Sequence, residues 1–276
     1  MSHKNATDRD VCRQLHCRVP IYAELRPDEL DALWTEGRFA VIPWGALEWH
    51  GSHLPLGLDG IVAEWFAARL AVSEGAVLLP GIWLPMTTLP HQHSLQIRTE
   101  TFRMLLDDLF AGLYQSGARK VCLVTGHYAH GHLIEMTEAA IRAMEDHEGL
   151  LVFVGTPLEL LDDEKLLDHA AHYETSQLLA IRPDLVRLAE LPDDAKSTDT
   201  AVLGDSPALG SADEGIILLN RGLAAWRDWI QSGTFESVTQ HYRLLFDRYE
   251  PYVDAYYKGS WEDAIKEWWK DQDNTP

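Results

Sequence analysis

Short apolar segments alternate along the chain with longer amphipathic ones. Continuous apolar segments of four to six residues lie at 38–43, 76–79, 120–125 and 150–154, and they predict buried strands. Helical periodicity predicts helices at 60–73, 99–116, 132–147, 211–230 and 238–246. Strands that lack polar alternation and are joined by helices indicate a parallel sheet covered on both faces. The pattern therefore predicts an α/β protein, a three-layer α/β/α fold with a mostly parallel central sheet.

The two ends of the chain differ from this alternating region. Residues 1–20 are polar and mixed, and we expect them to form an N-terminal arm. Residues 236–276 are rich in tyrosine and tryptophan at helical spacing, which predicts a C-terminal helical extension packed on the same domain or against another subunit. The chain shows neither an internal repeat nor a linker, so residues 21–235 are expected to form one main domain.

Composition narrows the range of functions. A formal net charge of −20 argues against nucleic acid or an anionic membrane as partner. The sequence shows neither the run of about 20 apolar residues that crosses a bilayer nor a secretory signal. Three cysteines (Cys12, Cys17 and Cys122) make no disulfide framework, which favours a reducing compartment. We therefore expect a cytoplasmic protein that acts on a small molecule.

The histidines gather where the predicted strands end. Nine of the thirteen fall in four short clusters, whereas structural histidines would scatter. The first cluster follows the strand at 38–43, where Glu48 and His50 are two residues apart and can face one cavity. Asp59 follows just before the next helix. Carboxylates and an imidazole at the carboxyl end of a parallel strand suit Zn²⁺, Mn²⁺ or Fe²⁺, and an aspartate can bridge two such cations.

A second cluster follows the strand at 120–125. His127 comes directly after Gly126 at the strand end, so its imidazole is expected to reach the same crevice as a metal ligand. His130 and His132 are expected on the first turn of the following helix, facing solvent. Tyr128 and His130 are also candidates for substrate binding.

Two further clusters supply candidates for catalysis and binding. In the segment 168–176 we expect His169 and Asp168 to be catalytic and Glu174 to bind metal, with His172 contacting substrate. His91 and His93 lie in a predicted loop that either faces the substrate or is a plain polar connection. A serine nucleophile is disfavoured because no Gly-x-Ser-x-Gly turn is present. A cysteine nucleophile is disfavoured because Cys122 lies inside a predicted strand.

These segments resemble the motifs of the creatininase (creatinine amidohydrolase) family. Residues 48–59 (EWHGSHLPLGLD) resemble its ExHG…LPLGxD signature, and 126–127 resemble the strand end of its NGHxxN motif. Residues 169–176 resemble its HAGxxETS element, and 211–215 its SAxxG helix start. The motifs occur in order between about residues 20 and 225. The resemblance implies an α/β/α fold, a centre of two divalent metals and a hexameric homo-oligomer.

The resemblance also implies roles for single residues. Glu48 and His127 would bind one metal and His50 the second, while Asp59 would bridge them and His169 would handle protons. The chain departs from the family at Ala129, where creatininase has a glutamate that binds the second metal. That site must therefore recruit another ligand, such as Glu174 or His130, or stay weakly occupied. The loop at 92–99 also differs, which makes creatinine an unsuitable substrate.

The sequence thus predicts a metal-dependent hydrolase that cleaves the C–N bond of a small amide, cyclic amides included, with a metal-activated water. One alternative is hydrolytic C–C cleavage of a cyclic diketone at the same centre. Another is a metal- or ligand-binding protein without catalytic activity, which the loss of the glutamate at Ala129 suggests. The native metal, the number of metals bound and the substrate stay open at this point.

Overall fold

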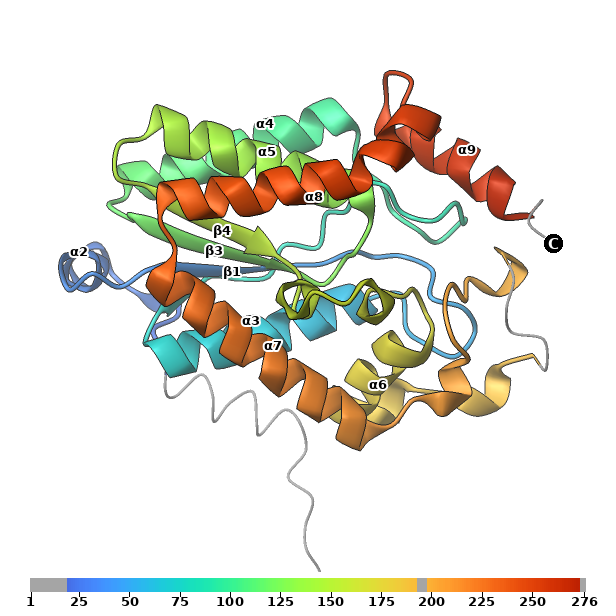
Figure 1. The fold of residues 1–276 in the computed structure, drawn as a ribbon. Coiled ribbons are helices and arrows are strands. Elements are labelled where there is room, and N and C mark those ends of the chain that lie inside the picture. The colour runs from blue at the N-terminus through green and yellow to red at the C-terminus, as the bar shows by residue number, and fades with distance from the viewer. Residues whose placement is uncertain (1–18, 193–197, 274–276) are drawn as a thin grey trace, which may run out of the picture.

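A parallel sheet lies at the centre of the computed structural model, which describes residues 19–192 and 198–273 (Figure 1). Its strands are β1 (Ala40–Trp44), β2 (Val77–Leu78), β3 (Lys120–Thr125) and β4 (Leu151–Gly155). Their spatial order is β2-β1-β3-β4, and each neighbouring pair is parallel. The four strands lie close to the predicted segments, because an uninterrupted apolar run suits a strand buried on both faces.

Helices cover both faces of the sheet. One face carries α4 (Thr99–Gln115), α5 (His130–Asp146) and α8 (Phe235–Tyr256); the other carries α3 (Leu58–Glu74) and α7 (Ala212–Ser232) (Figure 1). The remaining α-helices of the described ranges are α2 (Pro27–Thr35), α6 (His172–Ile181) and α9 (Trp261–Asp273). The predicted three-layer α/β/α fold with a parallel central sheet is therefore confirmed.

The register of the strands brings separate parts of the chain to one edge. Trp44 at the end of β1 pairs with Thr125 at the end of β3, so the loops that follow both strands begin side by side. A backbone hydrogen bond from Gly126 to Trp44 extends this pairing by one residue. The loops carrying Glu48 and His127 therefore leave the sheet at the same place, which is where ligands bind in open α/β sheets.

The last long helix differs from its prediction. We expected a helix at 238–246, but α8 continues to Tyr256 and contains Pro251. Proline removes one backbone donor inside a helix and often interrupts it. The apolar face nevertheless continues past the proline, because Tyr249 is buried and Tyr252 and Val253 pack against the main core.

Helix α8 also completes the hydrogen bonding of the sheet. Strand β4 is an edge strand, and an edge leaves backbone groups without a strand partner. The buried hydroxyl of Tyr242 accepts a hydrogen bond from the N–H of Val154 and donates one to the carbonyl of Val152, each with a length of 2.7 Å. Tyr242 thus takes the place of a neighbouring strand.

A buried carboxylate fixes the start of α9. Glu135 of α5 is 1% exposed and accepts hydrogen bonds from the guanidinium of Arg103 and from the indole N–H of Trp261. The Glu135→Gln variant is expected to lower the free energy of unfolding by about 2 kcal/mol, because hydrogen bonds to a charged acceptor become bonds to a neutral one. Urea unfolding measures this loss. The matched variant Glu138→Gln, on the exposed side of α5, should change stability by less than about 0.5 kcal/mol; equal losses would contradict this role of Glu135.

Several predictions concern the ends of the chain and its cysteines. Most of the predicted N-terminal arm, including Cys12 and Cys17, lies outside the described residues. Cys122 is a free thiol buried in β3. Across 19–192 and 198–273, no helix is both long enough and apolar enough to cross a bilayer.

Candidate metal centre

Three carboxylates and two imidazoles meet at the carboxyl ends of β1 and β3. Glu48 and His50 come from the loop after β1, and His127 from the loop after β3. Asp59 lies in the first turn of α3 and Glu174 in the first turn of α6. All five side chains are buried, with at most 3% exposure. Such a set of buried ionisable groups is costly unless its members neutralise one another or bind a cation.

Close backbone approaches set the position of Asp59. A Cβ atom at Gly126 would lie 2.1 Å from the carbonyl oxygen of Asp59, and one at Gly45 would lie 2.2 Å from the Cα of Gly60. Only glycine permits such contacts. The start of α3 is thereby held directly against the ends of β1 and β3.

The candidate ligand atoms form three groups: two share Asp59, and the third joins Glu48, His50 and His169. In the first group, His127 Nδ1 lies 3.0 Å from Glu48 Oε2 and 3.2 Å from Asp59 Oδ2. In the second, His50 Nε2 lies 3.0 Å from Asp59 Oδ1 and 3.6 Å from Glu174 Oε2. Within each group the candidate ligand atoms lie within 4.8 Å of one another. Because Asp59 offers one oxygen to each group, it is placed to bridge two cations.

Backbone carbonyls fix the orientation of both imidazoles. His50 Nδ1 lies 3.0 Å from the carbonyl oxygen of Glu48, and His127 Nε2 lies 3.0 Å from that of Met86. A carbonyl oxygen can only accept, so each of these ring nitrogens carries a hydrogen. The other nitrogen of each ring faces the carboxylates, where it either carries a proton or offers its lone pair to a metal, as in metal-binding histidines held by an outer hydrogen bond.

The electrostatics of the cluster favour added positive charge. Burial opposes ionisation of Glu48 and Asp59, but the charges of His127 and His50 outweigh it and lower the pKa of both carboxyl groups. Burial also opposes protonation of His50, but Asp59 and Glu174 outweigh it and raise its pKa to about 10. The pKa of His127 rises for the same reason, with Glu48 as the main partner. Either protons on the imidazoles or bound divalent cations would balance the negative charge of the carboxylates.

Unsatisfied atoms show that the residues fit a metal. Among the described residues, four buried ligand atoms make no hydrogen bond of acceptable angle: Glu48 Oε2, His50 Nε2, and Asp59 Oδ1 and Oδ2. Buried polar atoms without a partner are rare in folded proteins and call for an explanation, such as an ion. A mixed set of imidazole nitrogens and carboxylate oxygens suits Zn²⁺, Mn²⁺ or Fe²⁺. The second group contains Glu174, one of the two substitutes expected for the glutamate missing at Ala129, while His130 belongs to none of the groups.

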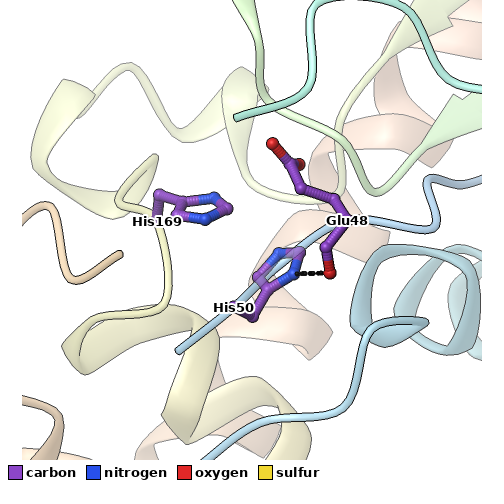
Figure 2. A group of neighbouring side chains, drawn as sticks. All are labelled: Glu48, His50 and His169. Atoms are coloured by element: carbon purple, nitrogen blue, oxygen red, sulfur yellow. Dashed lines mark hydrogen bonds between the residues drawn. The ribbon is translucent and has the colours of Figure 1, made fainter. Parts of the chain in front are cut away.

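His169 lies beside the two groups that share Asp59. Its ring centroid is 4.3 Å from that of His50, and Figure 2 shows it facing Glu48 and His50. His169 Nε2 lies 3.0 Å from the carbonyl oxygen of Trp49, so Nε2 carries the hydrogen and Nδ1 keeps a lone pair. Burial and the nearby His50 lower the pKa of His169 to about 4, which leaves its imidazole neutral at neutral pH.

Asp168 contacts the start of α6. Its two carboxylate oxygens accept backbone hydrogen bonds from Tyr173 at 2.7 Å and from Glu174 at 3.0 Å. These bonds satisfy free N–H groups of the first helical turn. Asp168 thereby helps to position Glu174, and its catalytic role stays a prediction.

A cavity of about 190 Å³ opens above the cluster. Its floor contains Glu48, His127, Asp168 and His169. The rest of its wall is formed by Thr87, Leu89, Tyr128, Ala129, His130, Leu167, Leu203, Tyr252, Ile265 and Trp268. Tyr128 and His130, predicted as substrate-binding residues, therefore line the cavity. Their contact with substrate stays a prediction.

Other predicted substrate contacts lie away from this wall. His91 stacks on Trp49 with ring centroids 4.6 Å apart, and His93 lies 5.3 Å from His91. His172 bonds to Glu214 through Nε2 at 2.6 Å. None of these three histidines lines the cavity, so their predicted contact with substrate stays a prediction.

His132 does not face solvent as we had expected. It is fully buried: its Nδ1 accepts a hydrogen bond from the N–H of Met86, and its Nε2 lies 3.3 Å from Thr125 Oγ1. That hydroxyl also accepts a hydrogen bond from the N–H of His127. His132 thus supports the two residues that hold His127 in place. The prediction failed because the first turn of α5 is covered by the loop around Met86.

The chain is similar to several hydrolases. The family profile described as creatininase, creatinine amidohydrolase, matches residues 23–235. The creatinine amidohydrolase of Pseudomonas putida is 28% identical over 57% of this chain and 70% of its own length. The mycofactocin precursor peptide peptidase of Mycobacterium tuberculosis is 29% identical over 72% and 87%. A 3-dehydro-scyllo-inosose hydrolase of Thermotoga maritima is 24% identical over 72% and 65%.

Solved structures show the same fold. A crystal structure of creatininase superposes with a TM-score of 0.67 at 22% identity and covers 77% of this chain and 97% of its own. A manganese form of creatininase and a mutant described as Zn-Zn type superpose with TM-scores of 0.66. Nearly all of each solved chain is matched, whereas part of this chain has no counterpart in them.

Proposed function

Because the chain belongs to the creatininase family, we propose that it is a hydrolase that cleaves the C–N bond of a small amide, cyclic amides included, at a centre of two divalent metals. One observation carries this proposal. Asp59 Oδ2 lies beside His127, which also contacts Glu48, and Asp59 Oδ1 lies beside His50, which also contacts Glu174. All five residues are buried, and Glu48 and His127 line the cavity. A plain polar loop would not gather three carboxylates and two imidazoles away from water.

The metals proposed for this chain are zinc, manganese or iron. Similar creatininases solved with manganese and with a zinc pair support the first two. When bound, such cations supply Lewis acidity and a water molecule of lowered pKa. The residues of the chain then have separate tasks. The carbonyls of Glu48 and Met86 hold the ligand imidazoles in one orientation, and Asp168 and the N–H of Ala170 hold Glu174.

His169 is the proposed proton carrier. In hydrolysis of an amide, the oxygen of water bonds to the carbonyl carbon, the C–N bond breaks, and a proton from the water reaches the departing nitrogen. The lone pair of His169 Nδ1 can accept that proton, since its other ring nitrogen is held by the carbonyl of Trp49. The products are a carboxylic acid and an amine.

The number of metals can be tested at Glu174. Wild-type protein is expected to bind about two equivalents of zinc per chain, and the Glu174→Gln variant about one, because the second group then loses its only carboxylate besides Asp59. Elemental analysis after dialysis gives the stoichiometry. The matched control Glu214→Gln, which changes a partner of His172 outside the cavity, should keep both metals. Equal stoichiometry in wild type and Glu174→Gln would remove Glu174 from the ligand set.

A panel of substrates tests the reaction. The metal-loaded protein is incubated with cyclic amides, short peptides and cyclic diketones, and new amine and carboxylate groups are measured. Release of amine from any amide supports the proposal. Metal binding without any product would instead favour a metal-binding protein without catalysis, and would overturn it.

Hydrolytic C–C cleavage of a cyclic diketone is the second candidate. The relative named as an inosose hydrolase supports it, because that name specifies no amide. The relative named as a peptidase favours the amide instead. In the panel, cleavage of diketones alone would select the second candidate. The expected homo-oligomer, a hexamer by family resemblance, and the cytoplasmic location stay predictions.

A further inference from the structure

Part of the cavity wall comes from beyond the family match. The match ends at residue 235, at the start of α8. Tyr252 on α8 and Ile265 and Trp268 on α9 nevertheless line the cavity whose floor holds Glu48 and His127. Figure 1 shows α9 beyond the end to which the strands point, above the loops that carry the site.

Specific contacts hold α9 in this position. Its first residue, Trp261, is 3% exposed, and its indole N–H donates a hydrogen bond of 2.7 Å to the carboxylate of Glu135. The next residue, Glu262, accepts hydrogen bonds from the N–H and hydroxyl of Thr99 at 2.7 and 3.1 Å. Trp261 also packs against Gly131, where a Cβ would lie 2.6 Å from the indole. The beginning of α9 is therefore fixed to α4 and α5.

The far part of α9 packs on the opposite side of the cavity. Ile265 is buried in a small apolar cluster with Leu89 and Ala201, and Trp268 packs against this cluster. Leu203, which also packs there, is paired by two backbone hydrogen bonds with His169. Helix α9 thus spans from the α4 and α5 side to the loop of the proposed proton carrier, and it covers the cavity with apolar side chains.

The chemistry of this wall selects a kind of ligand. Leu89, Leu203, Tyr252, Ile265 and Trp268 line the cavity, and among the described residues no lysine or arginine does. An anionic group would find no countercharge there and would lie near Glu48 and Asp168. An apolar cavity of about 150 Å³ is known to hold a benzene ring, so about 190 Å³ leaves room for a ring and a small polar head.

We infer that the C-terminal helices α8 and α9 form the specificity wall of the active site, and that the substrate carries an uncharged, ring-sized apolar group which packs against Tyr252, Ile265 and Trp268. This inference rests on the proposed function, because it places the scissile bond at the metal centre. It assigns substrate choice to a segment beyond residue 235, outside the family match, whereas the candidate metal ligands all lie within the match.

Binding of hydroxamates tests the wall without turnover. Hydroxamates chelate divalent metals, so acetohydroxamate reports the metal centre alone and 3-phenylpropionohydroxamate adds an apolar ring. Isothermal titration of the zinc-loaded protein should show the phenyl compound binding at least about tenfold more tightly, because its ring surface is removed from water. Succinic acid monohydroxamate, which carries an anionic tail, should bind no more tightly than acetohydroxamate.

The variants Trp268→Ala and Ile265→Ala should each lower the phenyl preference to about threefold or less, while the Kd of acetohydroxamate and the zinc content stay unchanged. Lys266→Ala is the control, since Lys266 is an exposed residue of the same helix and does not line the cavity; it should keep the preference. Equal binding of the two hydroxamates to wild type, or a full preference in both cavity variants, would overturn the specificity wall and leave the metal centre standing. Failure of both compounds to bind zinc-loaded protein would overturn the proposed function together with the wall.

Discussion

Replacement of Asp59 by alanine is expected to remove the bound metal and abolish hydrolysis. Among the described residues, Asp59 alone belongs to both the His127 group and the His50 group. Without it each group keeps one imidazole and one carboxylate, too few to hold a cation tightly. The affinity for zinc should fall by more than about 100-fold, since even the loss of an outer-shell partner costs about 10- to 100-fold.

Elemental analysis and initial rates of the same preparations measure both effects. Asp108→Ala is a suitable control, because Asp108 is an exposed aspartate of α4 far from the sheet edge that carries the site. It should keep full metal content and full rate. An Asp59→Ala protein with wild-type metal content and wild-type rates would refute the shared centre.

A single methyl group at Gly126 is expected to disrupt the centre from the backbone. The added Cβ would lie 2.1 Å from the carbonyl oxygen of Asp59 and 3.0 Å from its Cα, and neither backbone atom can move alone. The Gly126→Ala variant must therefore separate the end of β3 from the start of α3. We expect a loss of about 3 kcal/mol in the free energy of unfolding, from overpacking, and a loss of metal because His127 and Asp59 move apart.

Urea unfolding and metal analysis of this variant need a matched glycine. Gly112 lies within α4, where an added Cβ would meet no atom within 4 Å. Gly112→Ala should raise the free energy of unfolding by about 1 kcal/mol, because alanine is the better helix former. A Gly126→Ala protein as stable and as rich in metal as wild type would show that the two elements are not held by this contact.

The sequence was sufficient to predict the fold because each layer has its own local pattern. The buried strands β1, β3 and β4 appear as uninterrupted apolar runs, and their helices appear as amphipathic ones. The helix predicted at 238–246 was too short, because α8 continues through Pro251 to Tyr256. What decides its length is tertiary packing of aromatic side chains, which a local pattern does not contain.

The candidate metal centre was also accessible from sequence. Glu48, His50 and His127 all follow buried parallel strands, and parallel strands end at one edge. Glu174 was predicted from the short list of acids near the ordered motifs, and the structure places it 3.6 Å from His50. The environment of His132 was not accessible, because its burial depends on the distant loop around Met86.

The cavity wall was the part that sequence reasoning missed. The aromatic residues of the C-terminal segment were expected to serve packing or subunit contacts, and their helical spacing does predict a buried face. Nothing local shows that this face meets the loop after β1, more than 200 residues earlier. The signal that could have pointed there is the recurrence of large side chains at Tyr252, Trp261, Ile265 and Trp268, beyond the end of the family match at residue 235.

The hydroxyl of Tyr242 has a consequence for where this protein can be divided. The family match ends at residue 235, so a shortened chain could be designed to end at that residue. A fragment cut there would lose the group that satisfies Val152 and Val154, and it would expose an unprotected β-edge to other copies. The boundary of the shared motif is therefore not a folding boundary, and the shortened chain would self-associate instead of behaving as a minimal enzyme.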